Sequence, residues 1–193
     1  MLDFGEFCFQ HVQKTGGSFV RAFLKQCCKL DVKKDMGHKP VNTDFDPRKI
    51  YFATVRHPLS FYTSLYRFGC DRRGQLFHNL QKFGMEKLYC GNESGFFAWL
   101  DLLLDESQSA KVDQGYSEFA HLGVGLLTFR FLCQSMAYPK KKIRETNKKK
   151  DLERVYTDNN ILSFVIRNER LNEGLSDLAR SMWPEYFWVN ELD

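Results

Sequence analysis

A strand, a glycine turn and a helix follow one another without a gap in FCFQHVQKTGGSFVRAFL, residues 7–24. The first residues and Val12 have the apolar and aromatic side chains typical of a buried strand. The Gly16–Gly17 pair permits a sharp bend and a close approach to a ligand, and Ser18 stands where a helix N-cap is expected. The apolar residues that follow recur at helical spacing. The stretch therefore predicts a strand joined tightly to a helix.

An anion site is predicted in this turn. The first N–H groups of a helix have no partners within the helix, and the helix dipole favours negative charge there. Lys14 and Thr15 would add an ammonium and a hydroxyl to the same place. The turn is not a Walker A loop, because that motif has its lysine after the last glycine, whereas Lys14 precedes Gly16. The alternative is a plain glycine turn that binds nothing.

The chain is predicted to adopt an α/β fold. Two more apolar runs, Lys49–Val55 and Ile161–Ile166, predict buried strands. Strands separated by helices favour a central parallel sheet in a three-layer α/β/α arrangement, whose ligands bind at the carboxyl ends of the strands. With 193 residues, a single domain over residues 1–193 is expected. Helices are predicted over Ser60–Phe68, Leu76–Phe83, Phe96–Leu104, Ser117–Ala137 and Leu171–Met182. In the fourth of these, Gly123 and Gly125 are candidate points for a kink or an interruption.

Composition narrows the classes of function. The formal net charge of +4 is too small to predict nucleic-acid binding, and it suits a small anionic ligand. The six cysteines form neither a C-x-x-C pair nor a zinc-like cluster with histidine, so no metal site is predicted. A reducing compartment fits them, with a Cys70–Cys90 bridge as the alternative. Without a signal peptide or a membrane-spanning run, we expect a soluble cytoplasmic chain, or a Golgi-lumen protein if an anchor segment is missing.

A second candidate segment begins at Arg56, which ends the second predicted strand. Pro58 is a favoured first residue of a helix, so Ser60 and Ser64, four positions apart, would lie on one helix face. The guanidinium fork suits a phosphate, and Ser64 would add a hydroxyl to it. Arg56 and the glycine turn both follow strands of one predicted parallel sheet, so they should share a crevice. The alternative for Arg56 is an ordinary ion pair.

The two segments together resemble the sulfotransferases that use 3′-phosphoadenosine 5′-phosphosulfate (PAPS). HVQKTGGS resembles the 5′-phosphosulfate loop of that family, and VRHPLSFYTSLY resembles its 3′-phosphate segment. The sequences of these motifs are most similar to those of the carbohydrate branch of the family, which is Golgi-type and heparan-sulfate-like. Gly37–His38 matches a Gly-His pair of that branch, and FVIRNERLNEGLSDL resembles its terminal strand–Glu–helix element. Gln13 departs from the pattern, because the family usually has proline there.

The resemblance implies a P-loop-like nucleotide-binding sulfotransferase fold and a specific chemistry. A sulfuryl group would pass from PAPS to an acceptor hydroxyl, on a saccharide or another small molecule, without a metal ion. The implied catalytic residues are Lys14, which neutralises the leaving phosphate, and His38, the base that accepts the hydroxyl proton. The implied cofactor-binding residues are Lys14, Thr15, Gly16, Gly17, Ser18, Arg56 and Ser64.

Several alternatives stay open. His11 competes with His38 for the role of base, and His57 would orient the 3′-phosphate segment. Trp99, Tyr116 and Trp183 could stack on a sugar, although core packing is their ordinary role.

The competing functions are a nucleotide kinase with a variant phosphate loop, which needs Mg²⁺ and an acidic ligand after a strand, and a non-catalytic nucleotide-binding module. The basic run Lys140–Lys150 is expected to be a solvated mobile loop, or else a flap over an anionic ligand. The oligomeric state is not predicted.

Overall fold

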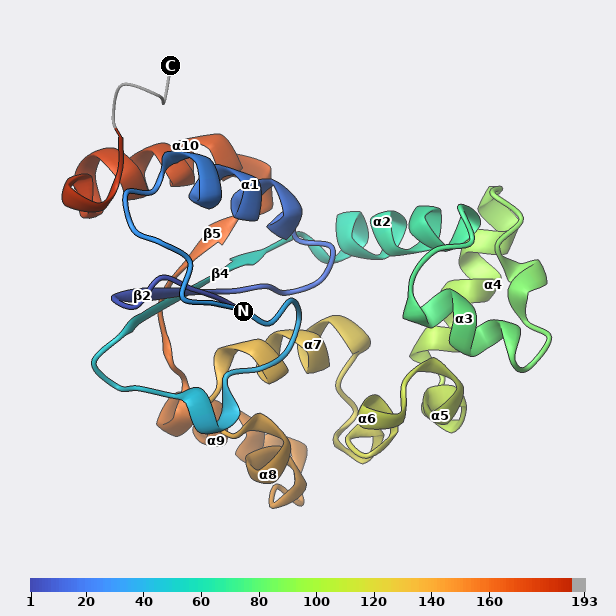
Figure 1. The fold of residues 1–193 in the computed structure, drawn as a ribbon. Coiled ribbons are helices and arrows are strands. Elements are labelled where there is room, and N and C mark those ends of the chain that lie inside the picture. Colours follow the sequence, from blue (N-terminus) through green and yellow to red (C-terminus); the bar gives the residue numbers. More distant parts are fainter. Residues whose placement is uncertain (189–193) are drawn as a thin grey trace. The chain divides into compact units, whose positions relative to one another are not determined.

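The computed structural model describes residues 1–188, and Figure 1 shows its elements. Backbone contacts divide the chain into two compact units. Unit 1 contains residues 1–57, 131–139 and the chain from residue 156 onward, whereas unit 2 contains residues 58–130 and 140–155. Neither unit is one continuous stretch of sequence. The single domain expected over residues 1–193 stays a prediction.

Unit 1 is built on a mixed sheet of five strands in the order β3-β1-β2-β4-β5. The strands β2, β4 and β5 are parallel, whereas β1 pairs antiparallel with both β2 and β3. The predicted α/β fold is therefore confirmed, with parallel strands at the centre of the sheet. The strands β1 and β3 were not predicted, because each contains only two residues. The strands are β1 (Leu2–Asp3), β2 (Phe7–Gln10), β3 (Lys34–Asp35), β4 (Ile50–Val55) and β5 (Leu162–Arg167).

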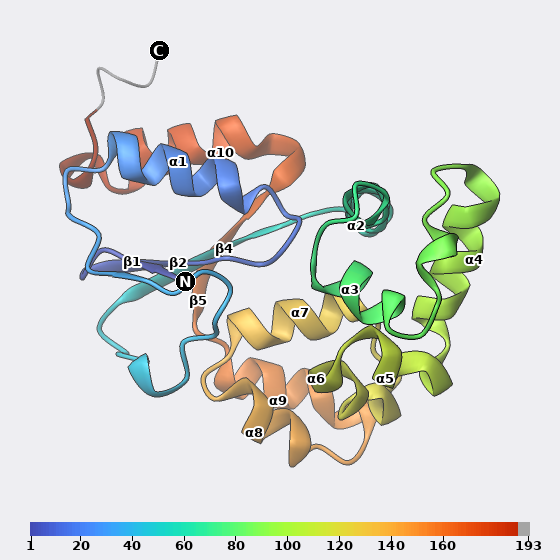
Figure 2. The ribbon, with the colours of Figure 1, turned by 45° about the vertical axis from the view of Figure 1, so that its right-hand side comes forward.

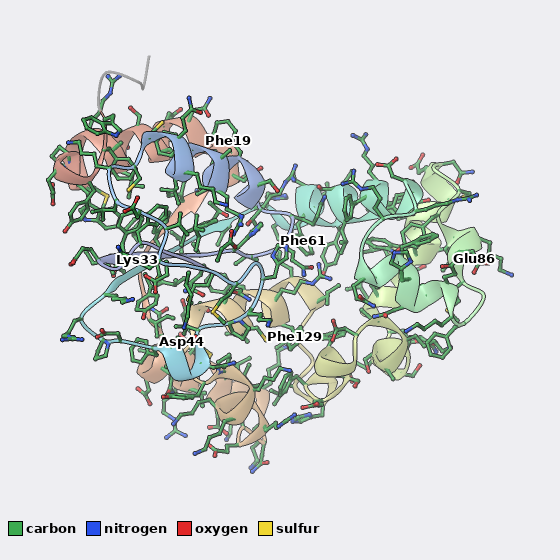
Figure 3. The ribbon with its side chains drawn as sticks, in the orientation of Figure 1. Phe19, Lys33, Asp44, Phe61, Glu86 and Phe129 are labelled. Carbon is green, nitrogen blue, oxygen red and sulfur yellow. The ribbon has the colours of Figure 1, made fainter. Side chains whose placement is uncertain are left out.

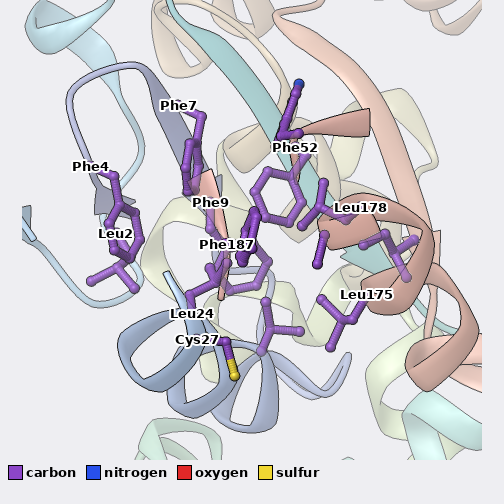
Figure 4. Close-up of a cluster of buried hydrophobic side chains, with 14 residues drawn as sticks. Leu2, Phe4, Phe7, Phe9, Leu24, Cys27, Phe52, Leu175, Leu178 and Phe187 are labelled. Atoms are coloured by element: carbon purple, nitrogen blue, oxygen red, sulfur yellow. The ribbon is translucent and has the colours of Figure 1, made fainter. Parts of the chain in front are cut away.

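Two helices of unit 1, α1 (Gly17–Cys27) and α10 (Leu171–Asp177), lie side by side over one face of this sheet (Figures 1 and 2). Leu24 and Leu175 from these helices belong to one buried cluster with Phe9 and Phe52 from the strands (Figure 4). Burying one such side chain contributes roughly 1.5–3 kcal/mol of transfer free energy. This packing holds the start of α1 close to the end of β2.

The opposite face of β2 and β4 has a smaller core. Cys8 and Tyr51 from these strands form a buried cluster with Met1 and Val41. Partly buried side chains between residues 36 and 45 pack against the same cluster. The irregular chain that leads to β4, which includes His38, is therefore anchored on the sheet.

Unit 2 is helical and has an aromatic core. Trp99 is fully buried, and the rings of Tyr66, Tyr89 and Phe96 lie with their centroids 5.3–6.0 Å from it. Its helices are α2 (Pro58–Cys70), α3 (Gln75–Gln81), α4 (Glu93–Leu104), α5 (Ser109–Val112) and α6 (Gln114–Ser117). The helices α7 (Leu126–Ser135), α8 (Pro139–Arg144) and α9 (Leu152–Asn159) pass from one unit into the other. Among residues 1–188, no helix has the length and apolar character that a membrane span needs.

The start of the first helix differs from the prediction. Gly16, in the left-handed conformation, is the N-cap of α1, and no side chain caps this helix. Ser18 is therefore the second residue of the helix. Phe19 is one of the apolar residues that recur at helical spacing after the turn, and it was expected on the buried face. It is 52% exposed (Figure 3), because Val20 and Leu24 form the buried stripe of the helix and Phe19 lies beside that stripe.

Three later predictions and one alternative are also corrected. The long helix expected over Ser117–Ala137 is interrupted, since Gly123 takes a left-handed φ of 58° and α7 begins only at Leu126. The strand β5 is not fully buried, because it is the edge strand of the sheet and its Val165 is 45% exposed. The basic run, expected to be a loop, begins with the helix α8. Cys70 and Cys90 are both free thiols, so they form no bridge.

Candidate functional site

Three chain segments meet where the parallel strands of unit 1 end. The strand β2 leads into the loop 11–16, which connects it to α1, and β4 ends directly before Arg56. The strand β5 leads into Asn168 and Glu169. This is the edge of the sheet where parallel α/β folds bind their ligands.

Side chains from the two neighbouring segments hold the loop by its carbonyl groups. Arg56 Nη1 donates a hydrogen bond to the carbonyl of Lys14 at 3.2 Å. Asn168 Nδ2 donates to the carbonyl of Thr15 at 3.3 Å. The loop and Arg56 therefore lie together, as expected for segments that follow adjacent parallel strands.

The side chain of Thr15 fixes the loop from inside. It is fully buried, and its Oγ1 donates to the carbonyl of Val12 at 2.8 Å and lies 2.7 Å from Thr54 Oγ1 on β4. This hydroxyl was expected to reach a phosphate, and that expectation is wrong, because the hydroxyl points into the protein. Its backbone N–H is the group of Thr15 that remains for a ligand.

The two glycines of the loop are needed for different reasons. Gly16 has a φ of 88°, and a Cβ there would lie 2.4 Å from Asn168 Nδ2. A Cβ on Gly17 would lie 2.0 Å from the imidazole of His11, so only glycine allows that ring against the helix start. Lys14 has a left-handed φ of 63°, which is uncommon outside glycine and occurs preferentially at functional sites.

The backbone N–H groups of Thr15–Ser18 are the candidate anion-binding groups of this loop. Within residues 1–188, no carbonyl and no side chain accepts a hydrogen bond from any of them. They precede or begin α1, where the helix dipole is positive. A phosphate or sulfate oxygen would satisfy them.

The segment after β5 adds a negative charge near Arg56. Glu169 Oε1 accepts a hydrogen bond from the backbone N–H of His57 at 2.8 Å. This bond, followed by the bond from its own backbone N–H and by the positive charge of Arg56, holds the pKa of Glu169 below its ordinary value. Glu169 is therefore ionised at neutral pH and partly balances the charge of Arg56.

The two histidines considered as the base form a pair. Their ring centroids are 4.0 Å apart with an interplanar angle of 45°. His38 Nδ1 lies 3.1 Å from the carbonyl oxygen of His11, and a carbonyl can only accept, so Nδ1 carries the proton. In the neutral ring, Nε2 of His38 is then the nitrogen that can accept a proton. Gln134 Nε2 donates to the carbonyl of His38 at 2.7 Å and holds its backbone.

His11 is poorly suited to be the base. It is only 7% exposed. Its burial, followed by electrostatic interactions with His38 and Arg21, lowers the pKa of His11 to about 3. A ring of such low basicity removes protons poorly near neutral pH. The geometry favours His38 over His11 as the candidate base. The carbonyl of His11 accepts the hydrogen bond that orients the His38 ring.

The buried neutral His11 predicts a pH-dependent stability. The pKa of His11 is about 3 in the folded chain, whereas its ordinary value, which applies to the unfolded chain, is 6.5. As the pH falls below 6.5, the unfolded chain therefore binds a proton before the folded chain does. Stability from this group is complete above pH 6.5 and declines below it. We expect the free energy of unfolding to fall by about 2 kcal/mol between pH 7 and pH 5 from this residue. Urea unfolding at both pH values measures it.

The matched variant for this measurement is His11→Asn, which has no titrating ring. Between pH 7 and pH 5, the free energy of unfolding of this variant should fall by about 2 kcal/mol less than that of the wild type. This difference should hold whatever the absolute stability of the variant. An equal pH dependence in the two proteins would show that His11 is not buried in its neutral form.

Other residues singled out in the sequence lie elsewhere. Ser64 is half-buried on α2 in unit 2, so its contact with the phosphate held by Arg56 stays a prediction. Trp99, Tyr116 and Trp183 are buried, so they are core residues and cannot stack on a sugar. A depression of about 430 Å³ in unit 2 is lined in part by Lys148, Lys150 and Arg154. Whether the basic run Lys140–Lys150 acts as a flap over an anionic ligand stays a prediction.

Two polar residues of the candidate site were not predicted from the sequence. Asn168 and Glu169 contact the loop and the Arg56–His57 segment, but they were treated only as part of a terminal element. Both directly follow an apolar strand, and this is the signal that had singled out Arg56. The signal could therefore have identified them.

Comparisons with known proteins add no assignment. No family model matches the chain, and no curated protein and no solved structure matches it.

Proposed function

We propose that this protein is a PAPS-dependent sulfotransferase with a three-layer, P-loop-like nucleotide-binding fold. The observation that carries the proposal is the set of N–H groups of Thr15–Ser18 without partners in the described chain, at the start of α1. Arg56, bonded to the same loop, brings a cation to this edge of the sheet.

The donor set suits a nucleotide with two separate anionic groups. The loop N–H groups would hold the 5′-phosphosulfate. The Arg56 guanidinium has five N–H donors, and its bond to the Lys14 carbonyl uses one of them. Other N–H groups of this guanidinium would bind the 3′-phosphate. A 3′-phosphate distinguishes PAPS from ATP-like nucleotides, so Arg56 would set the preference for the cofactor.

The proposed transfer needs a charge stabiliser and a base. PAPS supplies the sulfuryl group, whose bond to the 5′-phosphate breaks as a new bond forms to the acceptor oxygen. His38 Nε2 takes the hydroxyl proton, and Lys14 neutralises the charge that develops on the leaving 5′-phosphate. The products are a sulfate ester and adenosine 3′,5′-bisphosphate. As in phosphoryl transfer, positioning and charge stabilisation supply most of the catalysis.

A saccharide hydroxyl is the proposed acceptor, on the strength of the carbohydrate-branch resemblance in the loop and in Gly37–His38. The position of His38 beside the loop supports a hydroxyl acceptor, because a hydroxyl must lose its proton to become a sulfate ester. A nucleotide kinase and a non-catalytic nucleotide-binding module are the competing proposals.

Nucleotide preference tests the proposal. We expect adenosine 3′,5′-bisphosphate to bind about tenfold to a hundredfold more tightly than AMP, because a charge-assisted contact contributes about 1.5–3 kcal/mol. Isothermal titration calorimetry on the full chain with both nucleotides measures the difference. Arg56→Ala should reduce the difference without weakening AMP binding to the same degree.

The matched control is Arg48→Ala, because Arg48 is an exposed residue of the same unit whose guanidinium is bonded to Asp46. It should leave both affinities unchanged. Equal affinity for the two nucleotides in the wild type would remove the sulfotransferase proposal and favour a kinase-like nucleotide site.

A further inference from the structure

Two consecutive peptide groups of the loop are held by their oxygens. The carbonyl of Lys14 accepts from Arg56, and the carbonyl of Thr15 accepts from Asn168. The Asn168 amide can be oriented in only one way here, because a carbonyl needs a donor and the amide nitrogen is the donor of that side chain. Each bond therefore sets the rotation of one loop peptide.

The planarity of the peptide bond transmits this rotation to the N–H groups. In a trans peptide, the C=O of one residue and the N–H of the next point in opposite directions. The bond from Arg56 to the Lys14 carbonyl therefore directs the N–H of Thr15 away from Arg56. The bond from Asn168 to the Thr15 carbonyl likewise directs the N–H of Gly16 away from Asn168.

Asn168 is also packed tightly against the peptide that it orients. A Cβ on Gly16 would lie 2.4 Å from its Nδ2, so the amide fills the space that a side chain would occupy. Gly16 has the left-handed φ of 88° that gives this loop its bend. The side chain therefore holds both the position and the direction of the Gly16 peptide.

We infer that Asn168 is a positioning residue of the loop, which aims the Gly16 N–H at a bound phosphate or sulfate oxygen, with Arg56 doing the same for Thr15. The inference rests on the proposed function and deepens it, since it assigns the segment after β5 to the oxyanion site. It also separates two tasks of Arg56. The Thr15 N–H points away from this side chain, so the loop and the guanidinium serve different anionic groups of one nucleotide.

The test is a titration of the ¹⁵N-labelled full chain with adenosine 3′,5′-bisphosphate and with AMP, followed by amide resonances in NMR. Asn168→Asp keeps the shape of the side chain and removes its donor. Asn172→Asp makes the same change of charge at an exposed position in α10 and is the matched control. Asn168→Ala removes the donor without adding charge, in case the carboxylate alone affects binding.

In the wild type and in Asn172→Asp, the amide resonances of Thr15 and Gly16 should move on binding. In Asn168→Asp, the Gly16 resonance should differ already in the free protein, and both nucleotides should bind about tenfold more weakly, the effect of one lost hydrogen bond plus repulsion. Asn168→Ala should shift the Gly16 resonance and weaken nucleotide binding in the same direction, but to a smaller extent.

Unchanged affinity and an unchanged Gly16 resonance in both Asn168 variants would overturn the inference while leaving the proposed function standing. Binding that moves neither loop amide would overturn it as well. If the wild type binds the two nucleotides equally but Asn168→Asp still weakens both, the positioning role stands and the sulfotransferase proposal fails. A wild type that binds neither nucleotide overturns both.

Discussion

Replacing His38 with alanine is expected to lower the rate of sulfuryl transfer by about 100- to 10,000-fold, the range for loss of a general base. Its Nδ1 donates to the carbonyl of His11, which leaves Nε2 to accept the proton of the acceptor hydroxyl. The affinity for adenosine 3′,5′-bisphosphate should be nearly unchanged, because the base contacts the acceptor and not the nucleotide. The rate is measured as release of this nucleotide from PAPS with a panel of saccharide acceptors.

Two variants separate a base from a structural residue. His38→Asn retains a donor for the His11 carbonyl but has no basic nitrogen, so it should be as slow as His38→Ala. His78→Ala removes an exposed histidine of α3 in unit 2 and should keep the wild-type rate. Wild-type activity in His38→Asn would show that His38 only supports the fold of its segment.

Lys14→Ala is expected to lower kcat by about a hundredfold or more, by analogy with the loss of one preorganised group that stabilises transition-state charge. The lysine stands in the loop at a left-handed φ of 63°, directly before the N–H groups assigned to the 5′-phosphate. Charge on the leaving phosphate grows in the transition state, so KM should change much less than kcat. Initial rates over a range of PAPS concentrations give both constants.

The conservative variant Lys14→Arg should recover part of kcat, since it restores the positive charge. Lys33→Ala removes an exposed lysine of the same unit (Figure 3) and should leave both constants unchanged. An unchanged kcat in Lys14→Ala would show that this lysine takes no part in transfer.

The centre of the fold could be predicted from local patterns. Apolar runs identified β4 and placed β2 and β5 to within a few residues, because strands with a buried face need such side chains. The strands β1 and β3 could not be predicted, since two residues are too few for any pattern. The interruption at Gly123 was only suggested by its glycine, because a left-handed residue is visible only once the backbone is known.

The site was predictable in outline and not in its contacts. The loop 11–16 and Arg56 could be placed at the same edge of the sheet, because both follow parallel strands. The inward turn of the Thr15 hydroxyl depends on Thr54, which is distant in sequence, and the pairing of His11 with His38 depends on how the segment before β4 packs. Such contacts between separate segments leave no periodic signal in the chain.

A crystal structure of the protein with adenosine 3′,5′-bisphosphate tests the central claim most directly. The account predicts the 5′-phosphate on the N–H groups of Thr15–Ser18 and the 3′-phosphate within hydrogen-bond distance of Arg56. His38 Nε2 should face the open side of the 5′-phosphate, where an acceptor hydroxyl would stand. A nucleotide bound away from the loop, or bound in the loop with its 3′-phosphate in solvent, would contradict the account.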